Sequence, residues 1–179
     1  MNMASTTGLT YVRAGAGDND IKASNTFGSL LDAGAGDDVL RGGKKADILV
    51  GGAGDDEMYG GGGGDQFRFF GSEIEGDSDI DRIYDLDFSQ GDTLVFGDYD
   101  GLFQESDGLN AFDGGDSAII SSFEGLVSAV ENSNGRITTT FQSNGVLLVH
   151  MQIGDQVQTL YITNGVAGYQ AAAGGEVSA

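Results

Sequence analysis

The chain has 179 residues, enough for one domain of ordinary size or two small units on a common axis. Its 28 acidic and 8 basic residues give a formal net charge of −20, which disfavours nucleic acid and anionic membranes as partners and favours divalent cations. The sequence has no cysteine, which excludes disulfides and thiolate metal sites, and no apolar run long enough to insert into a membrane.

Nine-residue repeats fill the segment from residue 14 to residue 68. The copies are AGAGDNDIK (14–22), AGAGDDVLR (33–41), GGKKADILV (42–50), GGAGDDEMY (51–59) and GGGGGDQFR (60–68). Their consensus is Gly-Gly-x-Gly-x-Asp-x-apolar-x. The segment 24–32 keeps the apolar residue at Leu31 but lacks the first glycines and the Asp. We interpret it as a degenerate copy that follows a one-residue insertion at Ala23.

The consensus predicts a six-residue turn followed by a three-residue strand whose central side chain points inward. Two repeats then form one coil, so that every second repeat lies above another on the same side. The apolar positions should stack into a thin core, formed by Ile21, Leu31, Leu40, Leu49, Met58 and Phe67.

The same stacking places Asp38 over Asp56 and Asp47 over Asp65. Together with carbonyl oxygens of the glycine-rich turns, these carboxylates could form a six-oxygen cage, which suits Ca²⁺ better than Mg²⁺ or Zn²⁺. A core with one apolar side chain per repeat cannot by itself offset the entropy of ordering a glycine-rich chain. We therefore expect calcium binding to be coupled to folding.

Residues 69–100 form an acidic segment that we expect to close the end of the stack. Asp81 is the best candidate for a ligand that completes the last calcium turn. An EF-hand loop built on this segment is excluded, because Arg82 stands where that loop needs Gly and Phe88 where it needs Glu.

Residues 101–179 lack the nine-residue repeat, and we expect them to form a different kind of unit. Apolar spacing predicts a helix over 122–132, with Ser121 and Glu124 as a capping box. Three strands should follow, as an antiparallel meander packed on the end of the coils, and the last residues, YQAAAGGEVSA, should be frayed. The strands are expected at 136–141, 146–153 and 157–163.

The chain resembles, over about residues 14–165, the C-terminal hemolysin-type calcium-binding (RTX) regions of proteins exported by bacterial type I systems, such as serralysins. The resemblance rests on the repeats, on DRIYDLDFSQGDTLVF (81–96), and on the helix and hairpins that end near LYITNGV (160–166). It implies an all-β fold, a parallel β-roll followed by a cap with one helix and an antiparallel meander. The corresponding units are 1–68, 69–100 and 101–179.

The resemblance also implies ligands for several Ca²⁺ ions. Carboxylates at the sixth repeat position would be Asp38, Asp47, Asp56 and Asp65, with Asn19 in the equivalent place of the first copy. Turn carbonyls would come from Gly34, Gly36, Gly43, Gly52, Gly54, Gly61 and Gly63. Lys44 and Lys45 depart from the consensus and should weaken one cage, and Ser29 lacks a carboxylate.

The function implied is that of a secreted module that folds on calcium outside the cell and assists export and stability of a parent protein through the type I secretion machinery. The N-terminus lacks the features of a signal peptide, and a type I signal would lie near the C-terminus. The alternative is a carbohydrate-binding module of a secreted polysaccharide-modifying enzyme, for which Arg41, Lys44, Lys45 and Arg68 could contribute basic charge. An enzyme is disfavoured, because His150 is the single histidine and no nucleophile elbow is present.

Overall fold

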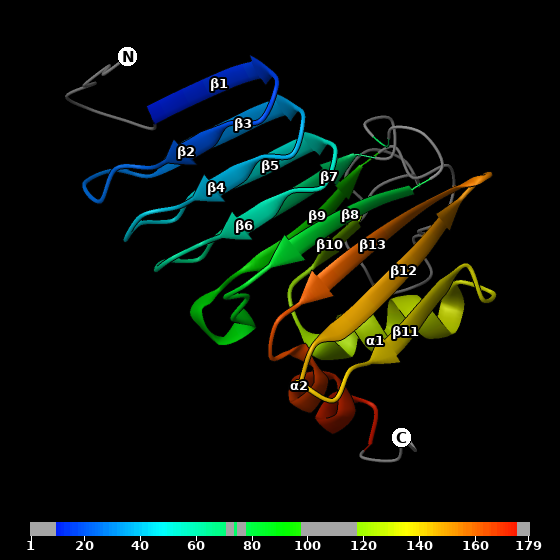
Figure 1. Ribbon diagram of the computed structural model, residues 1–179. Helices are drawn as coiled ribbons and strands as arrows, with labels where there is room; N and C mark the ends of the chain where they lie inside the picture. The colour runs from blue at the N-terminus through cyan, green and yellow to red at the C-terminus, as the bar shows by residue number, and fades with distance from the viewer. Residues whose placement is uncertain (1–9, 71–73, 75–77, 98–117, 175–179) are drawn as a thin grey trace.

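The computed structural model describes residues 10–70, 74, 78–97 and 118–174. Strands dominate this part of the chain, and they form two mixed sheets (Figure 1). Sheet A contains, in spatial order, β1 (Thr10–Ala16), β3 (Ser29–Ala35), β5 (Ile48–Ala53), β7 (Gln66–Phe70), β9 (Thr93–Gly97) and β10 (Ala118–Ile120). Sheet B contains β2 (Asp20–Lys22), β4 (Val39–Arg41), β6 (Glu57–Tyr59), β8 (Ser78–Ile83), β13 (Gln156–Ile162), β12 (Leu147–Ile153) and β11 (Ile137–Phe141).

The repeats wind between the two sheets, so that successive strands alternate between sheet A and sheet B. Strands one coil apart pair in parallel, with Leu31 beside Leu49 and Leu40 beside Met58. The expected two repeats per coil is confirmed. Across the degenerate copy, Ile21 pairs with Leu40, one residue further along the chain, which agrees with an insertion between β2 and β3.

The apolar position of each repeat forms the core between the sheets, as expected. Ile21 is 8% exposed, and the side chains of the five later positions are fully buried. The strand lengths differ from the prediction on one side. Strands of sheet B have three residues in β2, β4 and β6, whereas β3 and β5 run on through the first positions of the following repeat. Gly34 pairs there with Gly52 and Ala35 with Ala53, because residues without bulky side chains allow the ladder to continue.

Stacked turns approach one another closely at the glycines. Gly52 has a φ of +106°, and a Cβ added there would lie less than 3.0 Å from the carbonyl group of Gly34 in the neighbouring coil. Gly135 also has a positive φ, +82°, but a Cβ there would meet nothing within 4 Å. Substitution by alanine would therefore strain the backbone at both glycines, but only at Gly52 would the new Cβ also clash with the neighbouring coil.

We expect Gly52→Ala to reduce the free energy of unfolding by at least about 2 kcal/mol more than Gly135→Ala does, since backbone atoms cannot move aside. Urea unfolding of the two variants in calcium measures the difference. Equal losses in the free energy of unfolding would mean that the coils can move apart to accommodate the Cβ without further destabilisation.

The coils continue beyond the repeats. Strand β8 pairs with β6, which places Ile83 beside Met58, and β9 pairs with β7, which places Leu94 beside Phe67. Ile83 and Leu94 are fully buried and extend the core column. Part of the segment expected as an acidic cap thus supplies a further strand to each sheet, while the three-unit division of the chain stays a prediction.

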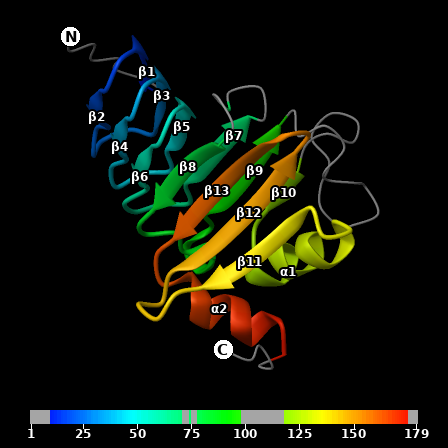
Figure 2. The ribbon, with the colours of Figure 1, turned by 45° about the vertical axis from the view of Figure 1, so that its right-hand side comes forward.

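The C-terminal meander extends sheet B, because β13 runs parallel to β8 and β12 and β11 follow antiparallel (Figure 2). The expected strands are confirmed within one residue at each end. Helix α1 (Phe123–Asn132) is capped by Ser122, whose hydroxyl accepts a hydrogen bond from the amide of Gly125 at 3.1 Å. The prediction of Ser121 as the cap was wrong.

The fold class needs one correction, since the chain has a second helix, α2 (Gly165–Ala172), which extends into the tail 169–179 that was expected to be frayed. The last five residues of that tail lie outside the described part of the chain. Tyr169 is 5% exposed and packs against Phe141, which anchors this helix to the meander. Neither α1 nor α2 approaches the length of a membrane span, and no described helix meets that requirement.

Candidate metal centre

The Asp residues at the sixth repeat position form two columns along the stack. In each column a carboxylate accepts a hydrogen bond from the backbone N–H of the corresponding residue one coil earlier. The amide of Asp38 donates to Asp56 Oδ1 at 2.9 Å, and the amide of Asp47 donates to Asp65 Oδ1 at 2.8 Å. The predicted stacking of these two pairs is confirmed.

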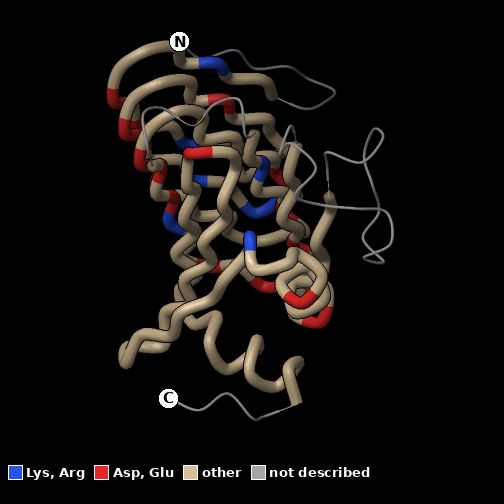
Figure 3. Tube along the Cα trace, turned by 90° about the vertical axis from the view of Figure 1, so that its right-hand side faces the viewer, with Lys and Arg blue, Asp and Glu red and all other residues tan. Residues whose placement is uncertain are grey.

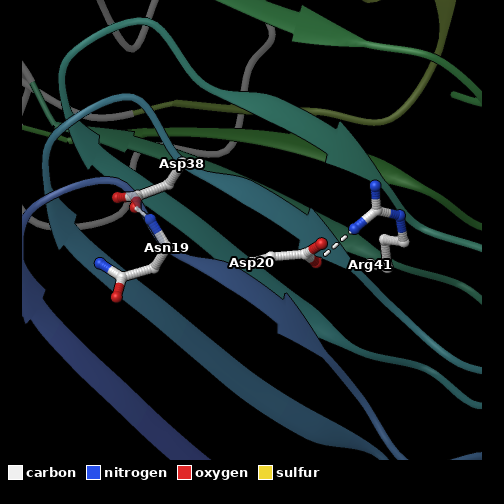
Figure 4. Close-up of polar contacts among 4 residues, drawn as sticks. All are labelled: Asn19, Asp20, Asp38 and Arg41. Atoms are coloured by element: carbon white, nitrogen blue, oxygen red, sulfur yellow. Dashed lines mark hydrogen bonds and ion pairs between the residues drawn. The ribbon is translucent and has the colours of Figure 1, made fainter.

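Each column extends in both directions. The first column contains Asn19, Asp38, Asp56 and Asp81, and the second contains Ser29, Asp47, Asp65 and Asp92. Asp81 accepts from the amide of Asp56 at 3.2 Å, and Asp92 accepts from that of Asp65 at 2.8 Å. Asn19 donates its backbone N–H to Asp38 at 2.6 Å and begins the first column (Figure 4).

The carboxylates fold back over the first glycine of their own repeat. A Cβ at Gly51 would lie less than 3.0 Å from Asp56 Oδ2, and a Cβ at Gly60 would be 2.6 Å from Asp65 Oδ2. The second oxygen of Asp56 and of Asp65 therefore lies inside the glycine-rich turn of its own repeat. At Gly51 and Gly60 only a residue without a side chain leaves room for that oxygen, whereas the repeat of Asp38 begins with Ala33.

Carbonyl oxygens of the glycine-rich turns lie between neighbouring coils. A Cβ at Gly52, Gly54 or Gly61 would lie closest to the carbonyl group of the glycine one coil earlier, and these are Gly34, Gly36 and Gly43. A Cβ at Gly42 would meet both the carbonyl oxygen of Gly60 and Asp47 Oδ2, so the stacked turns bring a backbone carbonyl and a carboxylate together there. All donors are hard oxygen atoms, which is the ligand chemistry of Ca²⁺.

Two of these carboxylates have an oxygen that is buried and has no hydrogen-bond partner, Asp38 Oδ2 and Asp56 Oδ2. A buried carboxylate oxygen without a partner is costly. The desolvation of burial raises the pKa of Asp56 to about 8 and that of Asp65 to about 6. It also raises the pKa of Asp38 and, well above its ordinary range, that of Asp81. A bound cation would compensate both penalties, so the donor set fits calcium.

Within the described residues, no group of three or more Asp, Glu, His or Cys side chains is arranged to hold an ion. A calcium site here must therefore draw part of its ligands from the turn carbonyls. This agrees with carboxylates in columns, one per turn, and not in a cluster.

The two edges of the stack carry unequal charge. Along the edge of the first column, the fifth repeat position is also acidic, and the amide of Asp37 donates to Asp18 while that of Asp55 donates to Asp37, at 3.1 and 3.0 Å. Along the other edge the fifth positions are Ala46 and Gly64. Figure 3 shows acidic residues recurring on successive coils.

Beyond the repeats, sequence reasoning missed Asp85 and Asp92, which accept hydrogen bonds from turn amides. Asp92 continues the second column, and Asp85 accepts from the amides of Gly60 and Gly61 at 2.7 and 2.9 Å. The signal for Asp92 was present, because Asp-x-Leu at 92–94 repeats the Asp-x-apolar spacing of the four copies between residues 33 and 68. Asp81 and Ile83 have the same spacing.

The basic residues named for a polysaccharide site do not gather in one groove. Arg41 is on sheet B, Arg68 is on sheet A, and Lys44 and Lys45 are in the turn between β4 and β5. Arg41 lies over one side of Tyr59, 5.5 Å from the ring centre, and Tyr84 stacks on that ring at 4.4 Å. These contacts leave the ring faces of Tyr59 engaged within the chain, and the carbohydrate-binding alternative stays a prediction.

His150 has a structural partner in sheet B. Its Nδ1 lies 3.0 Å from the hydroxyl of Thr159 on the adjacent strand β13. This contact agrees with the interpretation of His150 as a strand residue packed among neighbours.

We expect Asp56→Ala to weaken the calcium response of the protein by more than about tenfold, because it removes a carboxylate and leaves the amide of Asp38 unpaired. The matched control is Asp155→Ala, which removes an exposed carboxylate in the turn between β12 and β13. The midpoint of a calcium titration followed by circular dichroism compares the two. Equal midpoints would contradict the assignment of Asp56.

Comparison with known proteins agrees with this geometry. Residues 32–67 match the RTX calcium-binding nonapeptide repeat, in four copies. No curated protein matches the chain. The matched repeat is a calcium-binding element and not a catalytic one. Residues 32–67 are therefore similar to the RTX calcium-binding nonapeptide repeat, and the repeats of that family bind Ca²⁺ ions.

Proposed function

We propose that this chain is a calcium-dependent folding module, a parallel β-roll whose ions bind between successive turns along both carboxylate columns. The observation that carries the proposal is the pair of buried carboxylate oxygens without partners, on Asp38 and Asp56, inside turns that also contain glycine carbonyls. Bound calcium would supply the positively charged partner that these two oxygens lack.

The residues proposed as ligands are those of the two columns and their turns. Side-chain ligands are Asp38, Asp47, Asp56, Asp65 and Asp81, with Asn19 at the first turn and Asp92 added by its place in the second column. Carbonyl ligands are Gly34, Gly36, Gly43, Gly52, Gly54, Gly61 and Gly63. The exposed Lys44 and Lys45 should weaken the site in their turn.

The biological role we propose is folding after export. RTX proteins are typically secreted, and the submicromolar calcium of a cytosol would leave these sites empty and the carboxylates mutually repulsive. The chain would then pass through a type I exporter unfolded, fold at extracellular calcium, and stabilise its parent protein. Export of this chain with residues 133–179 removed tests the proposed C-terminal signal, and unchanged export would contradict it.

A calcium titration tests the binding proposal directly. Circular dichroism should show strand formation with a midpoint in the range of extracellular calcium modules, about 10⁻⁴ to 10⁻³ M, and magnesium should not replace calcium. Isothermal calorimetry should give several ions per chain. A protein that is fully folded without calcium, and binds none, would refute the proposed function.

A further inference from the structure

The two ends of the stack differ in the described part of the chain, since one end is covered and at the other no described segment pairs with the outer edges of the terminal strands. At the C-terminal end, helix α1 packs against β10 and β11, the last strands of the two sheets. At the N-terminal end, β1 and β2 are the terminal strands of sheets A and B in the described part of the chain (Figure 1). A terminal strand has one row of unpaired N–H and C=O groups and can pair with another strand.

Apolar side chains are exposed at this same open end. The large hydrophobic side chains exposed in the described residues are Tyr11, 56% exposed, and Phe27, 37% exposed. Tyr11 is in β1, and Phe27 is in the turn between β2 and β3. The core column also ends here, with Val12 only partly buried. Among the described residues these exposed apolar groups lie at one end of the stack, which indicates a contact surface there.

Hydrogen bonds to the inner neighbouring strands show which backbone groups remain at the free edge. The amide of Thr10 donates towards β3, to Gly28, and the carbonyl of Asn19 accepts from Val39 of β4. Successive residues of a strand direct these groups to opposite sides. Tyr11 and Arg13 in β1, and Asp20 and Lys22 in β2, therefore present their N–H and C=O groups outward.

We propose that a second copy of this chain pairs with this open end, head to head, so that both sheets continue across a two-fold axis. Strand β1 would pair antiparallel with β1 of the second copy, centred on Val12, and β2 with β2, centred on Ile21. In this register, Tyr11 faces Arg13 of the second copy. The outward backbone groups then meet in the hydrogen-bonded pairs of an antiparallel ladder.

The side chains are self-complementary in that register. Asp20 faces Lys22 of the second copy, and by symmetry Lys22 faces Asp20, so each chain contributes one acid and one base. Tyr11 opposite Arg13 adds an aromatic–cation pair. The carboxylate of Asp20 lies on the outer face, where it pairs with Arg41 of its own chain (Figure 4). A foreign strand would need this order of charges, whereas a second copy supplies it.

Repulsion between two chains of charge −20 is also limited by this arrangement. Antiparallel pairing puts the turn 17–19 of one copy, with its acidic Asp18, at the end where the second copy has its turn 23–28. The turn 23–28, ASNTFG, contains no charged residue. A two-fold contact closes on itself, so the product is a dimer and not a filament.

Charge reversal with its compensating variant tests the pairing. Sedimentation equilibrium in saturating calcium should show a dimer, and Lys22→Asp should raise its dissociation constant by at least about tenfold, because two like-charged pairs replace two opposite ones. The exchange Asp20→Lys with Lys22→Asp should restore part of the affinity, because the opposite charges between the copies return while the ion pair of Asp20 with Arg41 in its own chain is lost. A dimer that ignores the single reversal overturns the proposal, as does a monomer throughout the concentration series.

Cross-linking tests the register, and the absence of native cysteine makes single variants informative. Val12→Cys should form a disulfide-linked dimer, since Cα atoms of such a pair lie about 4.5 Å apart. Ser143→Cys, in the exposed turn between β11 and β12, should not. Equal cross-linking of both overturns the register. Circular dichroism of the same samples separates the proposals, because a chain that folds in calcium but stays monomeric refutes the dimer alone.

Discussion

Removal of calcium should unfold the coils between β1 and β9 and affect the C-terminal meander less. The coils have one core side chain per repeat, and their turns hold buried carboxylates whose charge lacks a partner within the chain. The meander has a denser core, formed with α1 and α2, and one of its strands, β12, has five buried residues. Calcium should therefore contribute most of the stability of the coils and less of that of the meander.

Hydrogen exchange read by mass spectrometry, before and after EGTA, measures this difference segment by segment. Amides of β3 to β6 should lose nearly all protection, while those of β11 and β12 should keep a measurable part of theirs. Magnesium added in place of calcium is the control, and it should not restore protection in the coils. Uniform protection in EGTA would show that apolar packing alone holds the coils together.

The repeat region was predictable because its periodicity is strict. A nine-residue spacing determines both the core column and the carboxylate columns, so the spacing alone is enough to place Leu49 and Asp56. The insertion at Ala23 could also be located, because Ile21 pairs with Leu40 and the spacing between them exceeds two repeats by one residue. Local sequence and global fold agree at these positions.

The end of the stack was harder, because its strands lack the glycine-rich turns that mark a repeat. Asp81 and Asp92 keep only the spacing from Asp to the apolar residue, and a three-residue pattern is common by chance. The long strands of sheet A were missed for the opposite reason. Glycine and alanine at 34 and 35 suggest a turn, yet pairing with the next coil extends the strand through them.

Helix α2 shows where tertiary contacts decide. Its sequence, GVAGYQAA, contains two glycines and no amphipathic pattern, so no helix was predicted here and the chain was expected to be frayed from Tyr169 onward. In the structure Tyr169 packs against Phe141, and the close approach of Gly168 to the ring of Phe123 requires a residue without a side chain. Both contacts involve residues distant in sequence, so single-sequence reasoning could not find them.

The stability of the protein should depend on pH with opposite sign in the absence and presence of calcium. Burial raises the pKa of Asp56 to about 8 and that of Asp65 to about 6, from an ordinary value of 3.8. Between the ordinary pKa of 3.8 and these raised pKa values, the folded, metal-free protein therefore binds more protons than the unfolded chain does. Its stability should be greatest below about pH 4 and should fall as the pH rises through 6 and 8. Hydrogen bonds from Ser89 and Gln90 lower the pKa of Asp87. This residue therefore makes stability rise with pH, but only at pH values below the ordinary pKa of an Asp side chain.

With calcium present, protons compete with the ion for the same carboxylate oxygens, so the apparent affinity should rise over the interval from pH 6 to 8. Circular dichroism of protein freed of metal on a chelating resin, between pH 4 and 9, should show structure gained on acidification. Calcium titrations at the same pH values should show the midpoint moving to higher calcium as the pH falls. Asp56→Asn, which keeps the side-chain size but cannot ionise, should reduce both dependences between pH 6 and 8, while the raised pKa of Asp81 leaves a part of them. Asp155→Asn, an exposed carboxylate outside the columns, should leave them unchanged. Metal-free protein that loses structure on acidification would show that these carboxylates are already charged and satisfied within the fold, which is incompatible with calcium as their missing partner.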